Sequence, residues 1–468
     1  MMMMRTESEL RAACKAADQS HLFNFWEELT DEQQASLLRQ INALDFKVVG
    51  ELRALQKSGG EIELAGDLEP PETFPLERHG ATEERARRAA QIGEVLLGAG
   101  KVGCVLVAGG QASRLGYDGP KGAFPVGPVS GRSLFEMHGR RLRAAAKRYG
   151  CPMPWYVMTS VQNDQATRDF MKQHHFFGLP ESDIFFFSQA MLPALGDDGR
   201  ILLAQKDQLF LAPNGHGGVL EALSTSGALR DMEQREVDLI SYFQVDNPMV
   251  RPIDPMFFGL HRLSVSAMSS KVVEKVDADE KVGVIGRIGG KLGIIEYSDL
   301  SAELRKAKDS TGKLQFRAGN IAVHAIDRAF VEELTAGGLQ LPWHLARKKM
   351  KFVASDGKIT EDWGTKFEAF VFDALSKSEN SITLEVSRAT EFSPVKNASG
   401  GDSPETARRD LCAMYASWVA GTARELPAAG DDGVVPVEID PLVAESAAAF
   451  QAAGAKPSIS SKGHLYEG

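Results

Sequence analysis

Cysteine is scarce in this chain of 468 residues: there are four, and none of them forms a Cys-x-x-Cys pair. Disulfide-rich scaffolds and structural zinc sites need cysteines at short, regular spacings, whereas Cys14, Cys104, Cys151 and Cys412 lie far apart in the sequence. The scarcity argues against both of these classes and is typical of proteins in a reducing compartment. We therefore expect a cytoplasmic protein.

Basic residues and long apolar runs are also in short supply. There are 53 Lys and Arg residues against 63 Asp and Glu residues, which gives a formal net charge of −10, and nonspecific nucleic-acid binding needs a basic surface. No segment approaches the roughly 18 consecutive apolar residues of a membrane-spanning helix, and the first residues lack the apolar core of a signal peptide. We therefore expect neither a nucleic-acid partner nor a membrane partner.

What the sequence does contain is enough apolar material for a large folded core, since 43% of its residues are hydrophobic. At about 150 residues per domain, the length predicts two or three domains. The first hundred residues have a helical periodicity, and short apolar runs replace it from residue 101 onward. We expect a helical N-terminal region over 1–98, a central α/β domain over 99–408 and a small C-terminal region over 409–468.

In the central region, the short apolar runs alternate with helical stretches. This alternation predicts a mostly parallel sheet covered by helices. Toward the end of the chain, Phe367–Leu375 predicts another amphipathic helix and Val434–Ile439 an extended segment. The predicted strands are Val102–Ala108, Trp155–Thr159, Ile184–Phe187 and Leu239–Val245, and the predicted helices among them are Ser133–Tyr149, Asn163–His174 and Leu220–Arg230.

The most informative motif is the segment 106–122, in which a buried strand runs into a loop rich in glycine. Gly109 and Gly110 come first, and Arg114 and Lys121 follow. Glycines let the backbone approach a ligand and direct its N–H groups at an anion, and ligands of α/β sheets bind at the carboxyl ends of strands. A rigid guanidinium and a mobile ammonium suit a polyphosphate. The motif predicts a phosphate site; a glycine turn with two solvated cations is the alternative.

Two common nucleotide fingerprints are absent from the chain. It has neither Gly-x-Gly-x-x-Gly nor Gly-x4-Gly-Lys-Ser/Thr at this loop, which argues against a hydride-transfer enzyme and a P-loop ATPase. The loop instead resembles the signature Gly-Gly-x-x-(Thr/Ser)-Arg-Leu-Gly followed by Pro-Lys-Gly of nucleotide-sugar pyrophosphorylases. From His21–Trp26 to Val437–Leu442, nearly the whole chain is similar to the UDP-N-acetylhexosamine pyrophosphorylases of the UTP–sugar-1-phosphate uridylyltransferase group.

The resemblance implies a fold and a reaction. The fold is a Rossmann-like nucleotidyltransferase domain with a mixed, mostly parallel sheet, flanked by a helical N-terminal part and a small β-containing C-terminal part. The reaction converts UTP and a sugar 1-phosphate to a UDP-sugar and pyrophosphate with Mg²⁺, by in-line attack on the α-phosphorus of UTP. Such a reaction needs no covalent enzyme intermediate, so the protein must supply positioning and charge neutralisation.

The resemblance also implies which residues hold the phosphates of UTP. In the signature loop these are Gly109, Gly110, Arg114 and Lys121, the last two stabilising the transition state, and Lys396 would reach the phosphates from the late loop 391–397. For Lys396 alone, a solvated surface charge is the alternative. The loop has Ala112 where the family usually has Gly, so we expect this position not to need a positive φ.

Three further positions match the family's nucleotide-binding segments. Gln189 corresponds to the residue that reads the uracil edge, a task that suits an amide because it can donate and accept at once; a surface glutamine is the alternative. Gly215 and His216 belong to the glycine-rich loop over the base and sugar. Members specific for N-acetylglucosamine usually carry Asn at the position of His216, whereas glucose-type members carry Gly-His-Gly there. The resemblance therefore leaves the sugar open.

The remaining matches concern the metal and the sugar. Asp246 follows the predicted strand Leu239–Val245, and a carboxylate there suits Mg²⁺, which prefers oxygen ligands; a turn or helix-cap Asp is the alternative. Glu296, Tyr297 and Asn320 correspond to the residues that contact the sugar. N-acetylglucosamine 1-phosphate is the leading substrate that the resemblance implies, and glucose 1-phosphate or a broad range of sugar 1-phosphates is the alternative.

Two other functional classes are less consistent with the sequence. A nonenzymatic sugar-nucleotide sensor on the same fold predicts the loss of Arg114, Lys121 or Asp246, and all three are present. A glycosyltransferase of similar fold needs an Asp-x-Asp metal motif near the end of a strand, and the sequence at 245–247 is Val-Asp-Asn. We therefore expect an enzyme of the uridylyltransferase class.

Overall fold

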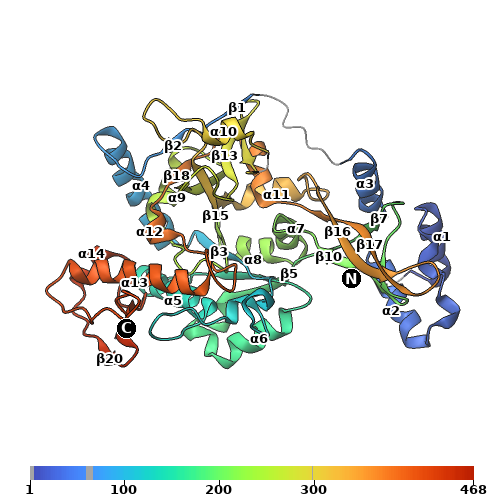
Figure 1. Ribbon diagram of the computed structural model, residues 1–468, viewed down its shortest axis with the longest axis horizontal. Helices are drawn as coiled ribbons and strands as arrows, with labels where there is room; N and C mark the ends of the chain where they lie inside the picture. Colours follow the sequence, from blue (N-terminus) through green and yellow to red (C-terminus); the bar gives the residue numbers. More distant parts are fainter. Residues whose placement is uncertain (1–4, 60–66, 298, 468) are drawn as a thin grey trace. The chain divides into compact units, whose positions relative to one another are not determined.

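The computed structural model describes residues 5–59, 67–297 and 299–467 (Figure 1). The chain forms two compact units that alternate along the sequence. The predicted three-part division at residues 98 and 408 follows the sequence rather than these units and stays a prediction. The described residues of Met1–Leu64, Gln189–Gly218 and Gln340–Val371 form the first unit, and those of Ala65–Ser188, Val219–Leu339 and Phe372–Gly468 form the second.

The second unit contains a large mixed sheet, in which eleven strands are described (Figure 1). Its main path runs in the order β2-β18-β12-β15-β11-β3-β4-β5. β11, β3, β4 and β5 are parallel, whereas β15 is antiparallel to both of its neighbours. The predicted mixed α/β sheet is confirmed. The strands of the path are β2 (Thr73–Phe74), β18 (Thr383–Glu385), β12 (Met268–Glu274), β15 (Ala318–Asp327), β11 (Leu239–Gln244), β3 (Val102–Val107), β4 (Trp155–Thr159) and β5 (Ile184–Ser188).

The central strands are buried on both faces, which explains their nearly continuous apolar sequence. Helices cover the sheet, among them α4 (Ala81–Gly98), α5 (Leu134–Tyr149), α6 (Asp164–Gln173) and α9 (Pro255–Leu263). α4 and α9 meet backbone to backbone, because a Cβ atom on Gly259 would lie 1.7 Å from the carbonyl oxygen of Ala89. The four predicted strands and the two predicted helices at α5 and α6 are confirmed.

One predicted helix is wrong as a single element. Leu220–Arg230 divides into α7 (Gly218–Thr225) and α8 (Ala228–Gln234), with Gly227 between them at a φ of 89°. This left-handed conformation is one that glycine adopts without strain, and it cannot continue a right-handed helix. Two short helices therefore replace the predicted long one.

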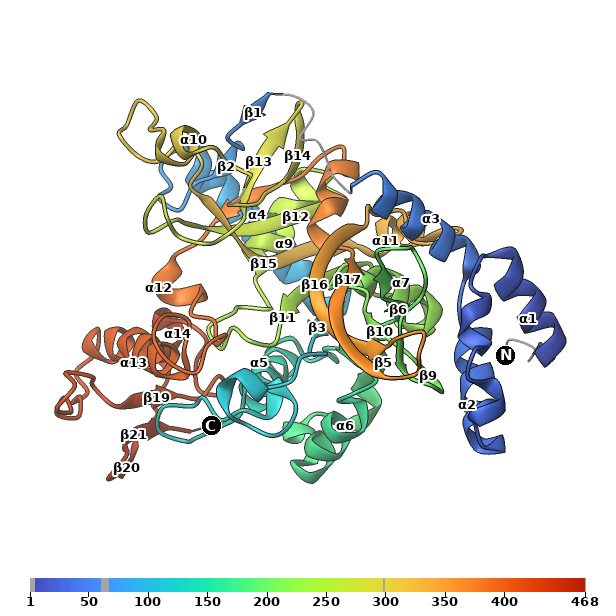
Figure 2. The ribbon, with the colours of Figure 1, turned by 45° about the vertical axis from the view of Figure 1, so that its right-hand side comes forward.

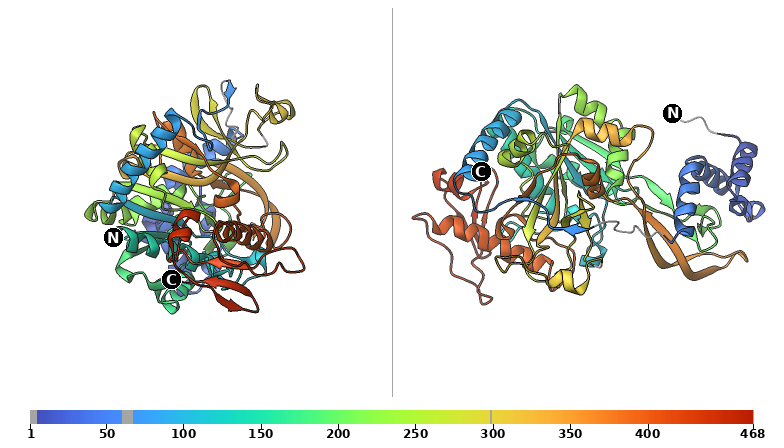
Figure 3. Two further views of the ribbon diagram at one scale, coloured as in Figure 1. Left: turned by 90° about the vertical axis from the view of Figure 1, so that its left-hand side faces the viewer. Right: turned by 90° about the horizontal axis from the view of Figure 1, so that it is seen from above.

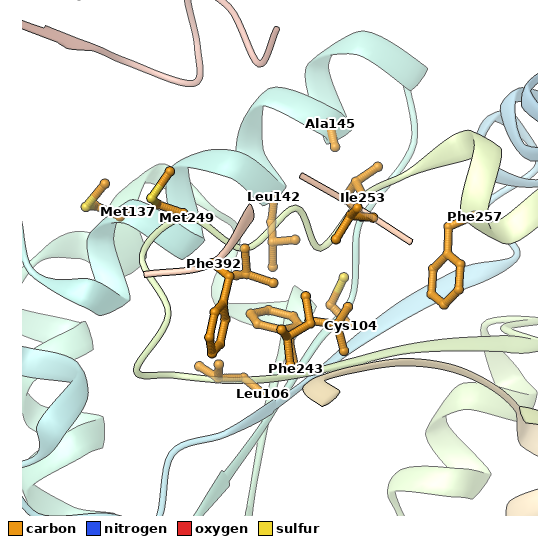
Figure 4. Close-up of a cluster of buried hydrophobic side chains, with 14 of the residues drawn as sticks. Cys104, Leu106, Met137, Leu142, Ala145, Phe243, Met249, Ile253, Phe257 and Phe392 are labelled. Carbon is orange, nitrogen blue, oxygen red and sulfur yellow. The ribbon is translucent and has the colours of Figure 1, made fainter. Parts of the chain in front are cut away.

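The core of the second unit lies between α5 and the sheet (Figure 4). Leu142 and Ala145 from α5 face the cluster that contains Leu106 and Phe243 from the strands, and burying each large side chain contributes about 1.5–3 kcal/mol. His138, also on α5, is fully buried, and one ring nitrogen lies 3.1 Å from the carbonyl oxygen of Val245. Burial lowers its pKa to about 3, so a neutral imidazole holds the carboxyl end of β11.

The first unit combines three helices with a long β ribbon, seen clearly in Figure 2. The ribbon consists of β16 (His344–Val353) and β17 (Ile359–Glu368), and β17 also pairs with β7 (Leu195–Gly196). A separate two-stranded sheet joins β6 (Met191–Pro193) to β10 (Leu211–Pro213). The helices are α1 (Glu7–Ala16), α2 (Asp31–Asn42) and α3 (Phe46–Lys57).

The predicted amphipathic helix Phe367–Leu375 is wrong. Phe367 pairs with Leu345 in the ribbon, β17 ends at Glu368, and a 3₁₀ helix spans Val371–Lys377. The backbone of Ala369 is hydrogen-bonded to a different loop, because its N–H donates to Asn214 and its carbonyl oxygen accepts from Gly217. These pairings take the groups that an α-helix would have used.

The C-terminal part of the second unit is small and contains β-structure, as predicted (Figure 3). The helices α13 (Pro404–Ala420) and α14 (Ala447–Ala452) accompany a sheet of order β19-β21-β20. Only the end of the predicted extended segment is a strand, β19 (Val437–Ile439); the others are β20 (Ser458–Ser460) and β21 (Gly463–Tyr466). Over the described part of the chain, no helix has both the length and the apolar character needed to cross a membrane.

Candidate active site

The signature loop leaves the carboxyl end of β3 and closes on itself. The Ala112 N–H donates to the carbonyl oxygen of Gly119, and the Lys121 N–H donates to that of Gly110, both at 3.0 Å. Gly116 turns the chain in the left-handed region at a φ of 70°. Ala112 has a φ of −94°, which any residue adopts. The expectation that this position needs no positive φ is confirmed.

Asn163 anchors this loop and was missed by the sequence analysis. Its side chain is fully buried, and its Nδ2 donates to the carbonyl oxygens of Ala108 at 2.8 Å and Gly110 at 3.2 Å. Its Oδ1 accepts from the N–H of Ser160, which follows β4, at 2.8 Å. Asn163 therefore ties together the loops that follow two adjacent strands. A Ser-x-x-Asn pattern directly after a buried strand is the signal that could have identified it.

The neighbouring strand brings a carboxylate to the same edge of the sheet. Gln244 of β11 lies opposite Val107 of β3 in a parallel pair, so the loops that follow both strands leave together. Lys121 and Asp246 form an ion pair there, with Nζ 3.1 Å from Oδ2. Their side chains are only 18% and 14% exposed, so the pair is shielded more than an ordinary surface salt bridge.

A cavity of about 60 Å³ lies beside this pair, and three of the predicted site residues line it: Asp246, Asn320 and Lys396. The loop that carries Lys396 is attached to the end of β11, because the Val395 N–H donates to the carbonyl oxygen of Asp246 at 2.8 Å. Lys396 itself is half exposed, and its Nζ lies 3.6 Å from Oδ2 of Asp402. The topology thus gathers residues from three distant segments at one cavity.

A buried ion cluster supports the base of this late loop. Lys271 of β12 is fully buried, and its Nζ lies 2.7 Å from Oδ2 of Asp254 and 2.6 Å from Oε2 of Glu391. Burial alone would raise the pKa of Asp254, but the charges of Lys271 and Arg251 lower it well below its usual range. Asn247 completes the attachment, since its Nδ2 donates to the carbonyl oxygen of Glu391 at 2.7 Å.

Asn320, one of the predicted sugar-binding residues, lies at a bulge in β15. The pairing register with β12 shifts between Lys271 and Val272, and opposite this shift Ala322 has a positive φ of 54°. Oδ1 of Asn320 accepts from the Ala322 N–H at 3.1 Å, which stabilises the bulge. Bulges of this kind redirect side chains and are common beside active sites.

Glu296 and Asn320 flank the same residue, Gly283. The Asn320 N–H donates to the carbonyl oxygen of Gly283 at 2.9 Å, and Oε1 of Glu296 lies 3.2 Å from the point where a Cβ of Gly283 would be. Tyr297 follows Glu296 and is 36% exposed. Ser298, the last residue of the matched segment, lies outside the described residues.

Arg114 stands apart from these clusters. It lies on the 3₁₀ turn Ser113–Leu115 of the signature loop and is exposed. Among the described residues it has no hydrogen bond or ion pair with another side chain. The structure therefore leaves its guanidinium accessible to a ligand, and no hydrogen bond or ion pair joins it to Lys121 or Asp246.

The predicted base-binding residues belong to the first unit and form their own cluster. Nε2 of Gln189, a nearly buried side chain, donates to the carbonyl oxygen of Gly215 at 2.6 Å. Gly215 has a φ of 82°, and a Cβ there would lie 2.3 Å from the carbonyl oxygen of Ala369. Only glycine fits at this position, and the amide of Gln189 holds its carbonyl group in place.

His216 follows in the same loop. Its Nδ1 accepts from the Val371 N–H at 3.2 Å, which places the proton of the neutral ring on Nε2, and the ring stacks on Phe370 with centroids 5.2 Å apart. Burial, with a smaller contribution from the neighbouring His344, lowers the pKa of His216 to about 4. At neutral pH it is therefore an uncharged hydrogen-bonding group rather than a cation.

Comparisons with known proteins agree on one family. The model of the family described as UTP–glucose-1-phosphate uridylyltransferase matches residues 71–411. The chain is 37% identical to human UDP-N-acetylhexosamine pyrophosphorylase-like protein 1, over 95% of this chain and 94% of the human one. It is 33% identical to the UDP-N-acetylglucosamine pyrophosphorylase of Saccharomyces cerevisiae, covering 86% and 89% of the two chains.

Solved structures agree with the sequence comparison. The uridine diphosphate N-acetylglucosamine pyrophosphorylase of Trypanosoma brucei, in complex with an inhibitor, superposes with a TM-score of 0.81 at 25% identity, over 96% of this chain and 95% of that one. A UDP-glucose pyrophosphorylase of Leishmania major shares the fold, with a TM-score of 0.61 at 16% identity, over 90% and 87% of the two chains.

Proposed function

Because the chain belongs to the UTP–glucose-1-phosphate uridylyltransferase family, we propose that it converts UTP and N-acetylglucosamine 1-phosphate to UDP-N-acetylglucosamine and pyrophosphate. The observation that carries this proposal is the ion pair of Lys121 and Asp246 at the edge of the sheet, beside a cavity that Asp246 and Lys396 line. Cations and a carboxylate in this arrangement suit the transfer of a charged phosphoryl group.

In the proposed mechanism, the phosphate oxygen of the sugar 1-phosphate attacks the α-phosphorus of UTP. The new oxygen–phosphorus bond forms as the bond to the pyrophosphate breaks, and no proton has to be removed because the attacking oxygen is already charged. Gly109 and Gly110 would direct the loop at the UTP phosphates, while Arg114, Lys121 and Lys396 neutralise the developing charge. Removing one such electrostatic contact from an active site costs about 10²–10³ in kcat.

We propose Mg²⁺ as the cofactor, held by Asp246. No group of three or more candidate ligands from His, Cys, Asp and Glu is assembled within the described residues. A single carboxylate at a cavity edge nevertheless fits Mg²⁺, which protein sites often hold with one or two carboxylates, substrate phosphates and water. When bound, the ion would help to neutralise the negative charge of the phosphates. Lys121 keeps the carboxylate of Asp246 at this edge.

The substrate contacts are proposed in two groups. Gln189, Gly215 and His216 would bind the uridine, and Glu296, Tyr297 and Asn320 would contact the sugar. An ordered amide at Gln189 and a neutral imidazole at His216 supply the hydrogen-bonding groups that a uracil and a sugar need. We further propose a cytoplasmic location, which the four free cysteines support, three of them buried.

Glucose 1-phosphate is the second candidate substrate, and His216 favours it. This residue occupies the position at which the resemblance associates His with glucose-type members. A pocket that separates the two sugars by size alone gains about 1–3 kcal/mol of discrimination, so the loop around His216 could shift the preference.

The test is pyrophosphate release from UTP and Mg²⁺ with a panel of sugar 1-phosphates: N-acetylglucosamine, N-acetylgalactosamine, glucose and galactose 1-phosphate. We expect the fastest release with N-acetylglucosamine 1-phosphate and a loss of about 10²–10³ in kcat for Arg114→Ala. A preference for glucose 1-phosphate would transfer the assignment to the second candidate. No release with any sugar, or full activity of Arg114→Ala, would refute the proposed reaction or the proposed role of this loop, respectively.

A further inference from the structure

We propose that the second unit contains another ligand site, a cavity that binds a phosphorylated small molecule and regulates the enzyme. This cavity has a volume of about 590 Å³ and lies among α5, the segment 249–255, α13 and residues 439–449. None of the residues assigned to UTP or to the sugar lines it. Its size falls within the range of 300–1,000 Å³ that is usual for small-molecule sites.

Arg141 of α5 is the main reason to expect an anion there. It lines the cavity, its residue is only 7% exposed, and its Nη2 donates to the carbonyl oxygen of Pro248 at 2.6 Å. Its Nη1 has no hydrogen-bond partner, and no carboxylate lies within ion-pair distance of it among the described residues. A buried cation with an unused donor is unfavourable unless something binds it, and the pKa of Arg141 is lowered by that burial.

The charges around Arg141 favour a phosphate. Arg251 also lines the cavity, with Lys147 and Arg148 on α5. Two of these cations already have a carboxylate outside the lining, since Nη1 of Arg251 lies 3.9 Å from Oε1 of Glu391 and Arg148 is paired with Glu94. Among the described residues that line the cavity, Glu445 is the single carboxylate. Burial raises the pKa of Glu445 to about 7, which weakens the negative charge that it contributes near neutral pH. The excess of cations suits a phosphate dianion, which guanidinium groups bind in a forked geometry.

The rest of the wall would accept the body of an organic ligand. Met249, Ile253, Met414 and Trp418 contribute apolar and aromatic surface. Inorganic phosphate alone would leave this surface and most of the volume uncovered. The cavity therefore matches an organic phosphate of the size of a sugar phosphate or a nucleoside monophosphate.

The same backbone separates this cavity from the candidate active site. In the segment that follows Asp246, Asn247 and Val250 line the active-site cavity, whereas Met249, Arg251 and Ile253 line the second one. Figure 4 shows Ile253 beside Leu142 and Ala145 of α5, and Met249 beside Met137 of the same helix. A ligand that binds Arg141 and Arg251 would shift the segment that follows Asp246. Asn247, in the same segment, lines the active-site cavity and would move with it.

A second connection reaches the late loop. Thr390 lines the second cavity, and the next residue, Glu391, is held by Lys271 and by Asn247 and begins the loop that carries Lys396. Occupancy of the second cavity would therefore change the positions of both Asp246 and Lys396. The regulatory part of this inference rests on the proposed function, whereas the binding part does not.

The binding test uses the full chain and isothermal titration calorimetry with four probes: glucose 6-phosphate, UMP, inorganic phosphate and gluconate. Two variants remove the site in different ways. Arg141→Met removes the buried cation, and Ala144→Phe fills the cavity from α5 while it retains Arg141. Arg143→Met is the matched control, because Arg143 lies on the same helix and does not line the cavity. Lys121→Met reports binding at the active site.

We expect an organic phosphate to bind saturably, with a Kd that rises at least tenfold in Arg141→Met and in Ala144→Phe and stays unchanged in Arg143→Met and Lys121→Met. Tighter binding of gluconate than of both organic phosphates would refute the choice of phosphate. No saturable binding of glucose 6-phosphate or UMP would overturn the proposal, and so would binding that Ala144→Phe leaves intact. Circular dichroism and melting curves identify an unfolded variant, and Ala144→Phe still decides the question if Arg141→Met fails to fold.

The regulatory test adds the binding probe to the pyrophosphate-release assay. We expect the probe to change kcat or KM of the wild-type protein and of Arg143→Met at least twofold, and to have no effect on Ala144→Phe. An equal effect on all three proteins would place its action at the active site and overturn the regulatory inference. If the wild type releases no pyrophosphate at all, the proposed function fails, while calorimetry still decides whether the second site exists.

Discussion

Two glycine-rich loops carry the predicted nucleotide-binding residues, and they use glycine for opposite reasons. In the signature loop, the space beside Gly110 is open, and no atom lies within 4 Å of a Cβ built there. In the loop 213–218 of the first unit, a Cβ on Gly217 would lie 2.7 Å from the backbone of Ala369 and Phe370. The signature loop leaves space for a ligand beside Gly110, whereas the space beside Gly217 is filled by the protein's own backbone.

The comparison separates chemistry from scaffolding. The open loop contributes charges, and its neighbours Lys121 and Asp246 form a shielded ion pair. The packed loop contributes shape, and the ionisable side chain within it, His216, is kept neutral. Substitutions in the packed loop should therefore reduce stability first, whereas substitutions in the open loop should reduce activity first.

Gly217→Ala should have the largest effect. Its new methyl group would overlap backbone atoms that cannot move without breaking the hydrogen bond between Gly217 and Ala369, so we expect a loss of about 3 kcal/mol in the free energy of unfolding. Urea unfolding measures it. Gly50→Ala is the control in the same unit, because Gly50 is a helical position with open surroundings. We expect the Gly50→Ala variant to be more stable than the wild type by about 0.5–1 kcal/mol. Equal stability of the two variants would contradict the packing argument.

Gly110→Ala should leave the stability within about 0.5 kcal/mol of the wild type. We expect kcat/KM for UTP to fall by roughly ten- to a hundredfold, because the added methyl group occupies the space through which the phosphates approach the backbone. Steady-state kinetics and urea unfolding together distinguish this result from a folding defect. Gly98→Ala, another open position far from the loop in sequence, serves as the control, and full activity of Gly110→Ala would show that no ligand uses this space.

Asn163→Ala tests whether the protein itself holds the open loop in shape. The substitution removes the buried amide that donates to the carbonyl oxygens of Ala108 and Gly110, and of these two Gly110 keeps its bond from the Lys121 N–H; we expect a loss of about 1–2 kcal/mol in stability. We also expect kcat to fall. Because we assign Asn163 no contact with the substrate, a lower kcat would identify it as a positioning residue. Gln162→Ala, at the exposed neighbouring position, should change neither quantity. Unaltered kinetics of Asn163→Ala would mean that the ligand, and not this amide, orders the loop.

The smallest expected effect concerns the pH dependence contributed by His216. Its pKa is about 4 in the folded protein and about 6.5 in an unfolded chain, so the unfolded state binds more protons between these values and stability falls as the pH falls below about 6.5. From pH 7 to pH 6 the loss amounts to about 0.7 kcal/mol. Between pH 7 and pH 6, the free energy of unfolding should fall by this amount more in the wild type than in His216→Asn. An equal change in both proteins would contradict the neutral, buried imidazole.

The sequence was informative where one segment determines its own structure. The run Val102–Ala108 is continuously apolar and became the buried strand β3, and Ser133 begins α5 as its N-cap. The motifs also predicted that Arg114 and Lys121 follow one strand, β3, and that Asp246 follows another, β11. Because both strands are parallel and adjacent, the ends of these segments lie at one edge of the sheet.

The sequence was uninformative where distant backbone groups decide the outcome. The amphipathic pattern of Phe367–Leu375 favours a helix, but pairing with Leu345 and with the glycine loop overrides it. The bulge at Ala322 depends on its partner strand, and the buried position of Lys271 depends on two carboxylates that are far from it in the chain. No local sequence pattern predicts such contacts, because the sequence around a lysine or an alanine in a strand does not depend on whether the distant partner is present.

The attachment of Val395 to Asp246 has a consequence for the order of events during protein synthesis. A nascent chain that has been made as far as the end of β15 already contains Lys121, Asp246 and Asn320. The hydrogen bonds that close the cavity, however, come from residues made some 150 positions after Asp246. Domains fold as units as the chain emerges, but this cavity stays incomplete until Glu391 and Val395 have been added to the chain.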